Sequence, residues 1–210
     1  EIFAGLEKNG LVPMGLATGG FAFIMSQQPI RTMADLDDKK VWLPQGDQLT
    51  EIALKEIGAN AVPLTLGDVY TGLQTGLIDT IGTSPAGAIA LQWYTQVKYV
   101  TNYSLGYLGG WLAIGKKAWA KISPADQKIV RQVWADVYGQ INTDTWADTD
   151  NAMAALLNNG IELVDVPQAA EAQWQAAVER SLAKAGAAGT YNVKTLQRLR
   201  AALADFRATQ

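Results

Sequence analysis

The chain has 210 residues, of which 49% are hydrophobic and 18% charged, and its formal net charge is −3. This apolar content suffices for a folded core and argues against a disordered chain. Cysteine and histidine are both absent, which excludes disulfides, Cys/His zinc sites, thiol nucleophiles and Ser-His-Asp triads. The sequence has no long basic run, so it gives no support for binding to nucleic acid or lipid. No cofactor is expected.

The first residues are typical of the middle of an amphipathic helix. Ile2, Phe3 and Leu6 share one side, and Asn9-Gly10 is a typical helix end. The chain starts without Met or a signal peptide. We therefore expect a further segment upstream; the alternative is a processed terminus that begins in a helix. No apolar run approaches the roughly 18 residues of a membrane span.

The next part of the chain alternates between strand-like and helical patterns. Gly19-Gly20 is expected to break a long extended run into two strands. Strands are predicted at 11–16, 21–26, 40–44, 61–64, 77–82, 97–103 and 111–114. Helices are predicted at 33–36, 47–57, 68–75 and 85–92, with Leu49, Ile52, Ala53 and Leu54 as the buried stripe of the second. This alternation predicts an α/β architecture with mainly parallel strands.

The C-terminal half is predominantly helical. Ser123-Pro124-Ala125-Asp126 is a strong helix start, because Ser caps, Pro suits the first turn and Asp returns a bond. The helical pattern continues to residue 157 and ends at Asn158-Asn159-Gly160. A strand at 161–166 and helices at 167–185 and 193–207 follow, with Gly186 as the stop of the first. A helix this long in a small α/β protein usually spans more than one lobe.

Five motifs, in this order, carry a resemblance to a known family. They are R-T-M-A-D-L-D-D-K-K-V-W-L-P (31–44), L-K-E-I-G-A-N-A-V-P (54–63), D-V-Y-T-G-L-Q-T-G-L-I-D (68–79), W-Y-T-Q-V-K-Y (93–99) and K-K-A-W-A-K-I-S-P-A-D-Q (116–127). Their order and spacing resemble those of the TRAP transporter (DctP-type) periplasmic solute-binding proteins. The resemblance covers about half of the chain, and the C-terminal helices add little distinctive signal.

The resemblance implies an α/β, two-lobed periplasmic-binding-protein (type II-like) fold with a long lobe-crossing helix and a missing N-terminal portion. It implies that 1–25 return from lobe 1 and cross, 26–103 form lobe 2, 104–135 return to lobe 1, and 136–210 span both lobes. The function implied is a non-enzymatic receptor in the periplasm of a Gram-negative bacterium. Its partners would be a small-molecule solute, the TRAP membrane subunits, and the missing N-terminal segment of its own chain or a second copy.

The sequence departs from the family at its ligand positions. The family's carboxylate-binding Arg is replaced by Trp42, and its Q-E-N-P run corresponds to Ile81-Gly82-Thr83-Ser84-Pro85. A second ligand Arg of some members falls near Ala22. This favours a ligand with an apolar or aromatic body, or one with hydroxyls. The predicted ligand residues are Trp42, Gln45, Thr83, Ser84, Tyr103 and Tyr107.

Each of these residues also has a purely structural interpretation. Trp42 could be a core residue, Ser84 a helix cap and Gln45 a solvated turn residue. Tyr103 and Tyr107 lie in a Gly-rich stretch that could be a bulged strand. Trp119 and Trp134 are expected in the core.

Two other functions remain open at this point. Asp68 and Asp79 could serve a carboxylate-based hydrolase or isomerase if they shared one pocket, although structural roles are favoured for both. The same fold could also act as the ligand-sensing module of a signalling system. The 210 residues made alone are expected to self-associate, because surfaces of the first lobe would be left uncovered.

Overall fold

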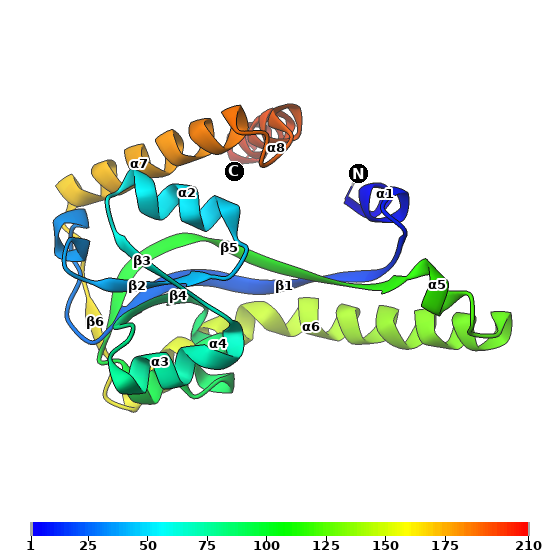
Figure 1. Ribbon diagram of the computed structural model, residues 1–210, viewed down its shortest axis with the longest axis horizontal. Helices are drawn as coiled ribbons and strands as arrows, with labels where there is room; N and C mark the ends of the chain where they lie inside the picture. The colour runs from blue at the N-terminus through cyan, green and yellow to red at the C-terminus, as the bar shows by residue number, and fades with distance from the viewer. Residues whose placement is uncertain (1, 210) are drawn as a thin grey trace.

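The computed structural model describes residues 2–209, except for the side chains of Trp146 and Ala147. One six-stranded sheet has the order β3-β2-β4-β1-β5-β6 (Figure 1). Its strands are β1 (Leu11–Ser26), β2 (Lys40–Pro44), β3 (Asn60–Leu64), β4 (Thr80–Thr83), β5 (Tyr99–Gly115) and β6 (Glu162–Val164). The helices are α1 (Ile2–Lys8), α2 (Gln48–Glu56), α3 (Val69–Thr75), α4 (Pro85–Ala90), α5 (Lys116–Trp119), α6 (Pro124–Asn158), α7 (Gln168–Ala187) and α8 (Val193–Ala208), with short 3-10 helices η1 (Met33–Leu36), η2 (Leu66–Asp68) and η3 (Trp93–Gln96).

The α/β class is confirmed, but the expectation of mainly parallel strands needs correction. β2 runs parallel to β3 and β4, and β5 runs parallel to β6. The central strand β1 is antiparallel to both of its neighbours, β4 and β5. Local alternation of strands and helices does not encode the direction in which a distant strand inserts between two others. The sheet is therefore mixed.

β1 and β5 are longer than predicted, because Gly19-Gly20 bends β1 without ending it. Gly20 has a φ of +79°, a conformation that suits glycine. The pairing with β5 shifts register between Thr18 and Gly20 and then continues to Ser26. The Gly-rich stretch 104–110 is likewise part of a strand, since β1 supplies its hydrogen-bonding partner. The two glycines therefore mark a bulge.

Helices cover both faces of the sheet (Figure 1): α3, α4 and α6 lie on one side, and α2 and α7 on the other. Successive strand residues point to opposite faces. Met25 and Trp42 accordingly pack in one core cluster, and Ile24 and Val41 in the other. The predicted stripe of α2 is only partly buried: Leu54 is in the core, whereas Leu49 is 41% exposed.

An ion-pair cluster joins α2 to α7. The guanidinium Nε of Arg180 lies 2.6 Å from a carboxylate oxygen of Glu56, and Lys184 bonds to the other oxygen. Hydrogen bonding to Lys184, and secondly to Arg180, lowers the pKa of the Glu56 carboxyl from its ordinary value.

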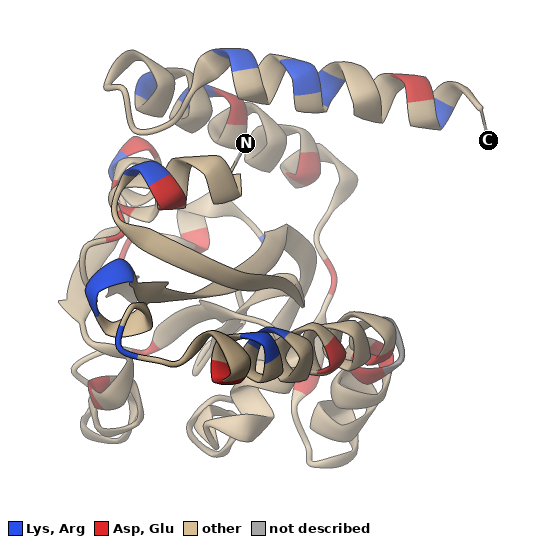
Figure 2. Cartoon of the chain, turned by 90° about the vertical axis from the view of Figure 1, so that its right-hand side faces the viewer, with Lys and Arg blue, Asp and Glu red and all other residues tan. Residues whose placement is uncertain are grey.

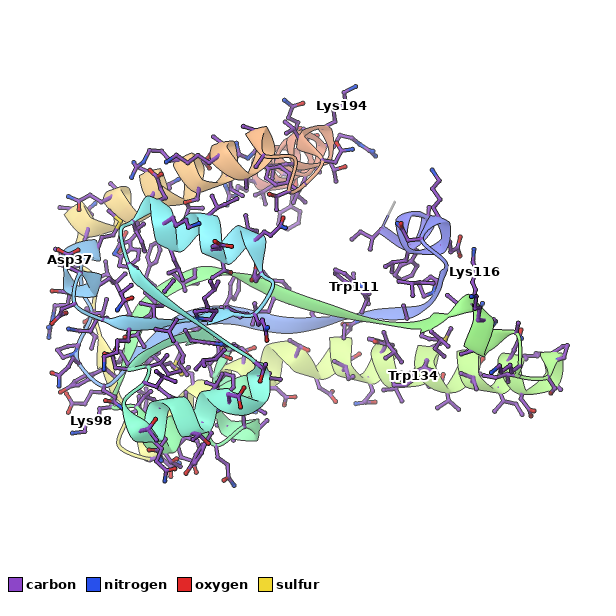
Figure 3. All side chains as sticks on the ribbon, in the orientation of Figure 1. Asp37, Lys98, Trp111, Lys116, Trp134 and Lys194 are labelled. Atoms are coloured by element: carbon purple, nitrogen blue, oxygen red, sulfur yellow. The ribbon has the colours of Figure 1, made fainter. Side chains whose placement is uncertain are left out.

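Beyond the sheet, residues 11–20 of β1 and 107–115 of β5 continue as a two-stranded ribbon that α6 follows along one face (Figure 1). Val12, Met14 and Trp119 form a third core cluster there, against which Trp134 packs. Trp119 is therefore a core residue, as predicted, whereas Trp134 is partly buried against the cluster. Trp111 lies on the other side of the ribbon from Trp134 (Figure 3) and is 52% exposed.

The termini of α6 follow their predicted signals, whereas the predicted stop of α7 at Gly186 is wrong. Ser123 caps α6, its hydroxyl accepting a hydrogen bond from the Asp126 amide at 3.2 Å. At about 1.5 Å per residue, the 35 residues of α6 reach about 50 Å. α7 continues through Gly186, and the left-handed residue beyond its end is Gly189. Among the described residues, no helix is long and apolar enough to cross a membrane.

Candidate functional site at the carboxyl edge of the sheet

The candidate site lies where β2, β3 and β4 end together. Because these strands are parallel, Pro44, Leu64 and Thr83 end at one edge of the sheet, called here the carboxyl edge. Gln45 follows β2 at this edge, and its backbone N–H donates to the Leu64 carbonyl at 3.1 Å. Its side chain is exposed. Ligands of open α/β sheets bind outside this edge, so the structure places Gln45 where a ligand residue is expected.

Capping residues fix the two helix starts beside this edge. Asp47 caps α2, accepting from the Thr50 amide at 3.0 Å and from the Thr50 hydroxyl at 2.6 Å. Ser84 caps α4, accepting from the Gly87 amide at 3.2 Å. The cap interpretation of Ser84 is therefore confirmed. A ligand would have to accept the hydrogen of the Ser84 hydroxyl or share its oxygen with the Gly87 amide.

Thr83 and Ser84 are both buried, and their hydroxyls occupy the space where a side chain at position 87 would lie. A Cβ at Gly87 would lie 2.9 Å from the Thr83 hydroxyl oxygen and 3.2 Å from that of Ser84. The corner therefore accepts no side chain at position 87 without displacing the hydroxyls. The structure brings these two predicted ligand residues together with Gln45 at one edge of the sheet.

An aromatic pair lies on the next two strands of the sheet, β1 and β5. Phe23 of β1 pairs with Thr83, and two residues earlier Phe21 pairs with Tyr107 of β5. The Phe21 and Tyr107 rings meet edge to face, with centroids 5.0 Å apart. β1 thus lies between Thr83 of β4 and Tyr107 of β5, whose partners on β1 are two residues apart. The sequence prediction did not include Phe21.

Trp42 lies beneath the edge rather than on it. The ring is 8% exposed and packs edge to face against Trp93, with centroids 5.2 Å apart. Its indole N–H donates to the Leu64 carbonyl at 3.1 Å. These contacts give Trp42 the core role that its sequence context left open. A direct contact with ligand stays a prediction.

Tyr103 is turned toward α7. Its ring centroid lies 6.1 Å from that of Trp174, and it packs against the core cluster of Ile24 and Leu36. The structure therefore does not bring Tyr103 together with Tyr107. Trp174 was absent from the predicted site, although the helical spacing of the buried positions of α7 could have indicated that it faces the sheet. It belongs to the buried α7 positions Ala170, Trp174, Ala177, Ser181 and Ala185.

A cavity of about 480 Å³ opens between the sheet, α2 and α7 and reaches the carboxyl edge at Pro44 and Asp47. Its walls are predominantly apolar, and Tyr107 lines it. Among the described residues, its lining includes one carboxylate, Asp47, and no Lys or Arg. The cavity therefore suits an uncharged or apolar group better than a free carboxylate.

The two aspartates of the alternative enzyme hypothesis lie at opposite edges of the sheet. Asp79 precedes β4, and its carboxylate accepts from the Lys40 amide at 3.0 Å where β2 begins. Asp68 follows β3 at the carboxyl edge and accepts from the Thr65 hydroxyl at 2.5 Å. Neither aspartate lines the cavity between the sheet, α2 and α7. Within the described part of the chain, no group of three Asp or Glu side chains is placed to hold a metal ion.

Comparisons with known proteins agree with this architecture. Residues 1–188 match the family described as "Bacterial extracellular solute-binding protein, family 7". A solute-binding protein of Roseobacter denitrificans is 30% identical over 132 residues, which are 62% of this chain and 40% of that protein. The ectoine-binding periplasmic protein TeaA of Halomonas elongata is 36% identical over 80 residues, 38% of this chain and 23% of that one.

A solved TRAP periplasmic solute-binding protein of Roseobacter denitrificans, with bound L-galactonate, superimposes with a TM-score of 0.74 at 27% identity. The match covers 84% of this chain and 58% of the solved one, so this chain spans less than two thirds of either relative's length. The two-lobed α/β fold of these TRAP receptors is also the fold of this chain. With the family matched over residues 1–188, the chain belongs to the bacterial extracellular solute-binding proteins of family 7.

Proposed function

We propose that this chain is the greater part of an extracytoplasmic receptor that captures a small organic acid or hydroxylated solute. The observation that carries the proposal is the shared fold, at 27% identity over 84% of the chain, with a receptor solved around L-galactonate. The absence of both histidine and cysteine, and the separation of Asp68 from Asp79, support a binding role over catalysis.

The carboxyl edge suggests which parts of a solute it would contact. Gln45, Thr83 and Ser84 offer an amide and two hydroxyls, and Tyr107 offers an aromatic ring and a further hydroxyl. We propose that these four contact ligand hydroxyls and the carbon skeleton, and that Trp42 and Tyr103 support them from beneath. Since the cavity lining contains no Lys or Arg, the proposal places the partner of any ligand carboxylate outside it.

The proposal extends to the lobes, the partners and the location. Residues 1–25 and 104–135 would belong to or lead to lobe 1, residues 26–103 to lobe 2, and residues 136–210 to both. Ligand would pass to the TRAP membrane subunits in the periplasm of a Gram-negative bacterium, as the names of the relatives suggest.

We further propose that polypeptide from outside these 210 residues, or a second copy, covers the open side of the ribbon. Support comes from the cross-strand pair of Leu16 and Trp111, which expose 42% and 52% of their surfaces. Bare apolar patches on a soluble protein usually mark contact surfaces.

A thermal-shift screen of the complete natural polypeptide tests the ligand proposal. The panel comprises L-galactonate, D-glucuronate, ectoine, aromatic acids and polyols. A ligand that binds only the native state raises the unfolding midpoint. We expect one of these classes to raise it, and Thr83→Val and Gln45→Ala to reduce the shift. The control Gln74→Ala changes an exposed amide on α3 and should leave the shift unchanged. A folded protein with no shift for any compound would contradict the receptor function.

A further inference from the structure

Asn142 of α6 bonds to β1 next to its bulge, through both ends of its side-chain amide. Its carbonyl oxygen accepts from the Thr18 amide at 2.9 Å and from the Thr18 hydroxyl at 3.1 Å. Its NH₂ group donates to the Leu16 carbonyl at 3.0 Å. One helix turn on, the Thr145 hydroxyl donates to the Thr18 carbonyl at 3.1 Å. The backbone on both sides of Ala17 is therefore held by side chains of α6.

This polar contact lies between two apolar ones along α6. Toward its N-terminus, Trp134 packs against the cluster under the ribbon. Toward its C-terminus, Met153 and Leu156 pack in the core of the sheet. Asn142 and Thr145 occupy the interval between them. Apolar contacts join each end of α6 firmly to one part of the molecule, whereas the middle is joined by a few directional bonds.

β1 is irregular in the segment that begins at the Asn142 contact. Three of its four register shifts against β5 lie between Thr18 and Met25. Gly20 has a left-handed backbone, and a Cβ there would lie 2.7 Å from the Thr149 hydroxyl oxygen. Bulges loosen strand pairing and concentrate bending at one place.

The middle of α6 has the composition of a bendable helix. Gly139 leaves the helix without a side chain at that point. The hydroxyls of Thr143 and Thr149 donate back to the carbonyl four residues earlier, at 2.9 and 2.7 Å. The single hydroxyl hydrogen of Thr145 is shared between the Thr18 carbonyl and the Ile141 carbonyl, which lies 2.7 Å away. Such bonds compete with the helix ladder and favour bending. The weak section of the helix thus coincides with the bulge of the strand.

We propose that Asn142 is a positioning residue that couples the bend of α6 to the bulge of β1 and so sets the angle between ribbon and sheet. It touches no residue of the candidate site, and it acts on ligand binding through that angle. This inference rests on the proposed receptor function, in which the sheet and the ribbon belong to different lobes. Breaking the three Asn142 bonds would let strand and helix bend independently.

Spin labels can measure this angle without any ligand. The chain has no cysteine, so Lys98→Cys and Lys117→Cys introduce two unique labelling sites at exposed positions. Lys98 directly precedes β5 at one end of the sheet (Figure 3), and Lys117 is on α5 at the far end of the ribbon. In the complete natural polypeptide, we expect one narrow distance distribution that Asn142→Ala broadens or shifts. Asn142→Asp keeps the acceptor for Thr18 but loses the donor to Leu16, and should give an intermediate change.

Gln140→Ala is the matched control, because the Gln140 amide bonds to Asp144 on the same helix at 2.6 Å. It should leave the distribution unchanged. A distribution that is the same in native protein, Asn142→Ala and Asn142→Asp, with all three folded by circular dichroism, would overturn the proposal. Loss of folding in Asn142→Ala leaves Asn142→Asp to decide.

The ligand measurement separates failure of this inference from failure of the receptor function. With the compound found in the thermal-shift panel, L-galactonate being the first probe, Asn142→Ala should change the Kd by about three- to ten-fold. The Gln140→Ala control should not. A ligand that binds native and Asn142→Ala protein equally, with equal distance distributions, refutes the positioning role alone. Absence of any ligand refutes the receptor function and leaves the spin-label result to be judged by itself.

Discussion

The body of the sheet and the ribbon differ in how they are covered. In the body, helices lie on both faces, and residues such as Met25, Leu73, Ile81 and Trp93 are 2% exposed or less. The ribbon has α6 on one face, and on the other Trp111 is half exposed. Both parts share β1, β5 and α6.

The difference teaches that one continuous pair of strands can belong to a closed core and to an open surface. The body buries its apolar side chains with its own helices. The ribbon depends on a single helix, and its charged residues are few compared with those of the outer helices (Figure 2). We expect substitutions in the body to cost more stability than equivalent ones on the ribbon.

The largest effect is expected from Trp93→Ala. The ring is 2% exposed and supports Trp42, so its loss leaves a cavity and should cost about 3–5 kcal/mol of unfolding free energy. Urea denaturation followed by circular dichroism measures it. Leu77→Ala, at a side chain 50% exposed, is the control and should cost under about 1 kcal/mol. Equal losses in the two variants would refute the closed core of the body.

A smaller loss is expected from Gly15→Ala in the ribbon. A Cβ there would lie 2.3 Å from the Tyr138 ring, and Tyr138 also accepts a hydrogen bond from the Leu112 amide. Displacing α6 should cost about 1–3 kcal/mol. Gly110→Ala, which meets no atom within 4 Å, is the matched control on the partner strand. A stable Gly15→Ala protein would mean that α6 is not seated closely on the ribbon.

Glu56→Gln should weaken the attachment of α7 to α2 in a pH-dependent way. Bonds to Lys184 and Arg180 lower the pKa of the Glu56 carboxyl in the folded state. Its contribution is therefore present above the unfolded pKa of about 4.3 and is lost as the pH falls through the lower folded value. The variant should melt earlier than native protein at neutral pH, and the difference should shrink as the pH is lowered below the unfolded pKa. Glu51→Gln, whose partner is the exposed Lys55, should show little change across this range.

The smallest effect on folding is expected from Trp111→Gln, because the ring is already half exposed. Stability should change by less than about 0.5 kcal/mol. The 210-residue chain made alone should nevertheless self-associate less, since part of the open face of the ribbon has become polar. Sedimentation velocity measures the change. Unaltered association would place the self-associating surface elsewhere.

Much of the local structure could be predicted because its signals are local. The strand at 40–44, the caps Asp47, Ser84 and Ser123, and the end of α6 at Asn159-Gly160 each follow from a few adjacent residues. Errors occurred where a distant partner decides the outcome. Gly19-Gly20 looks like a break, but pairing with β5 carries the strand through it.

The candidate site was predictable in part for the same reason. Gln45 and Ser84 directly follow strands and Thr83 ends one, and parallel strands end at a common edge, so sequence alone could group them. Trp42 and Tyr103 depend on which face of the sheet each ring takes and what lies there, here Trp93 and Trp174. Phe21 joined Tyr107 only through the register of β1 and β5.

Local hydrophobic patterns and capping residues in the sequence thus determined most helix and strand types and many of their ends, and the ordered motifs determined the family resemblance. The tertiary structure alone decided the direction and place of β1, the coincidence of Asn142 with its bulge, and which aromatic rings reach the edge. These features depend on contacts between residues up to about 127 positions apart. No local preference of the chain encodes such contacts, because their free energy arises only when the distant segments pack together.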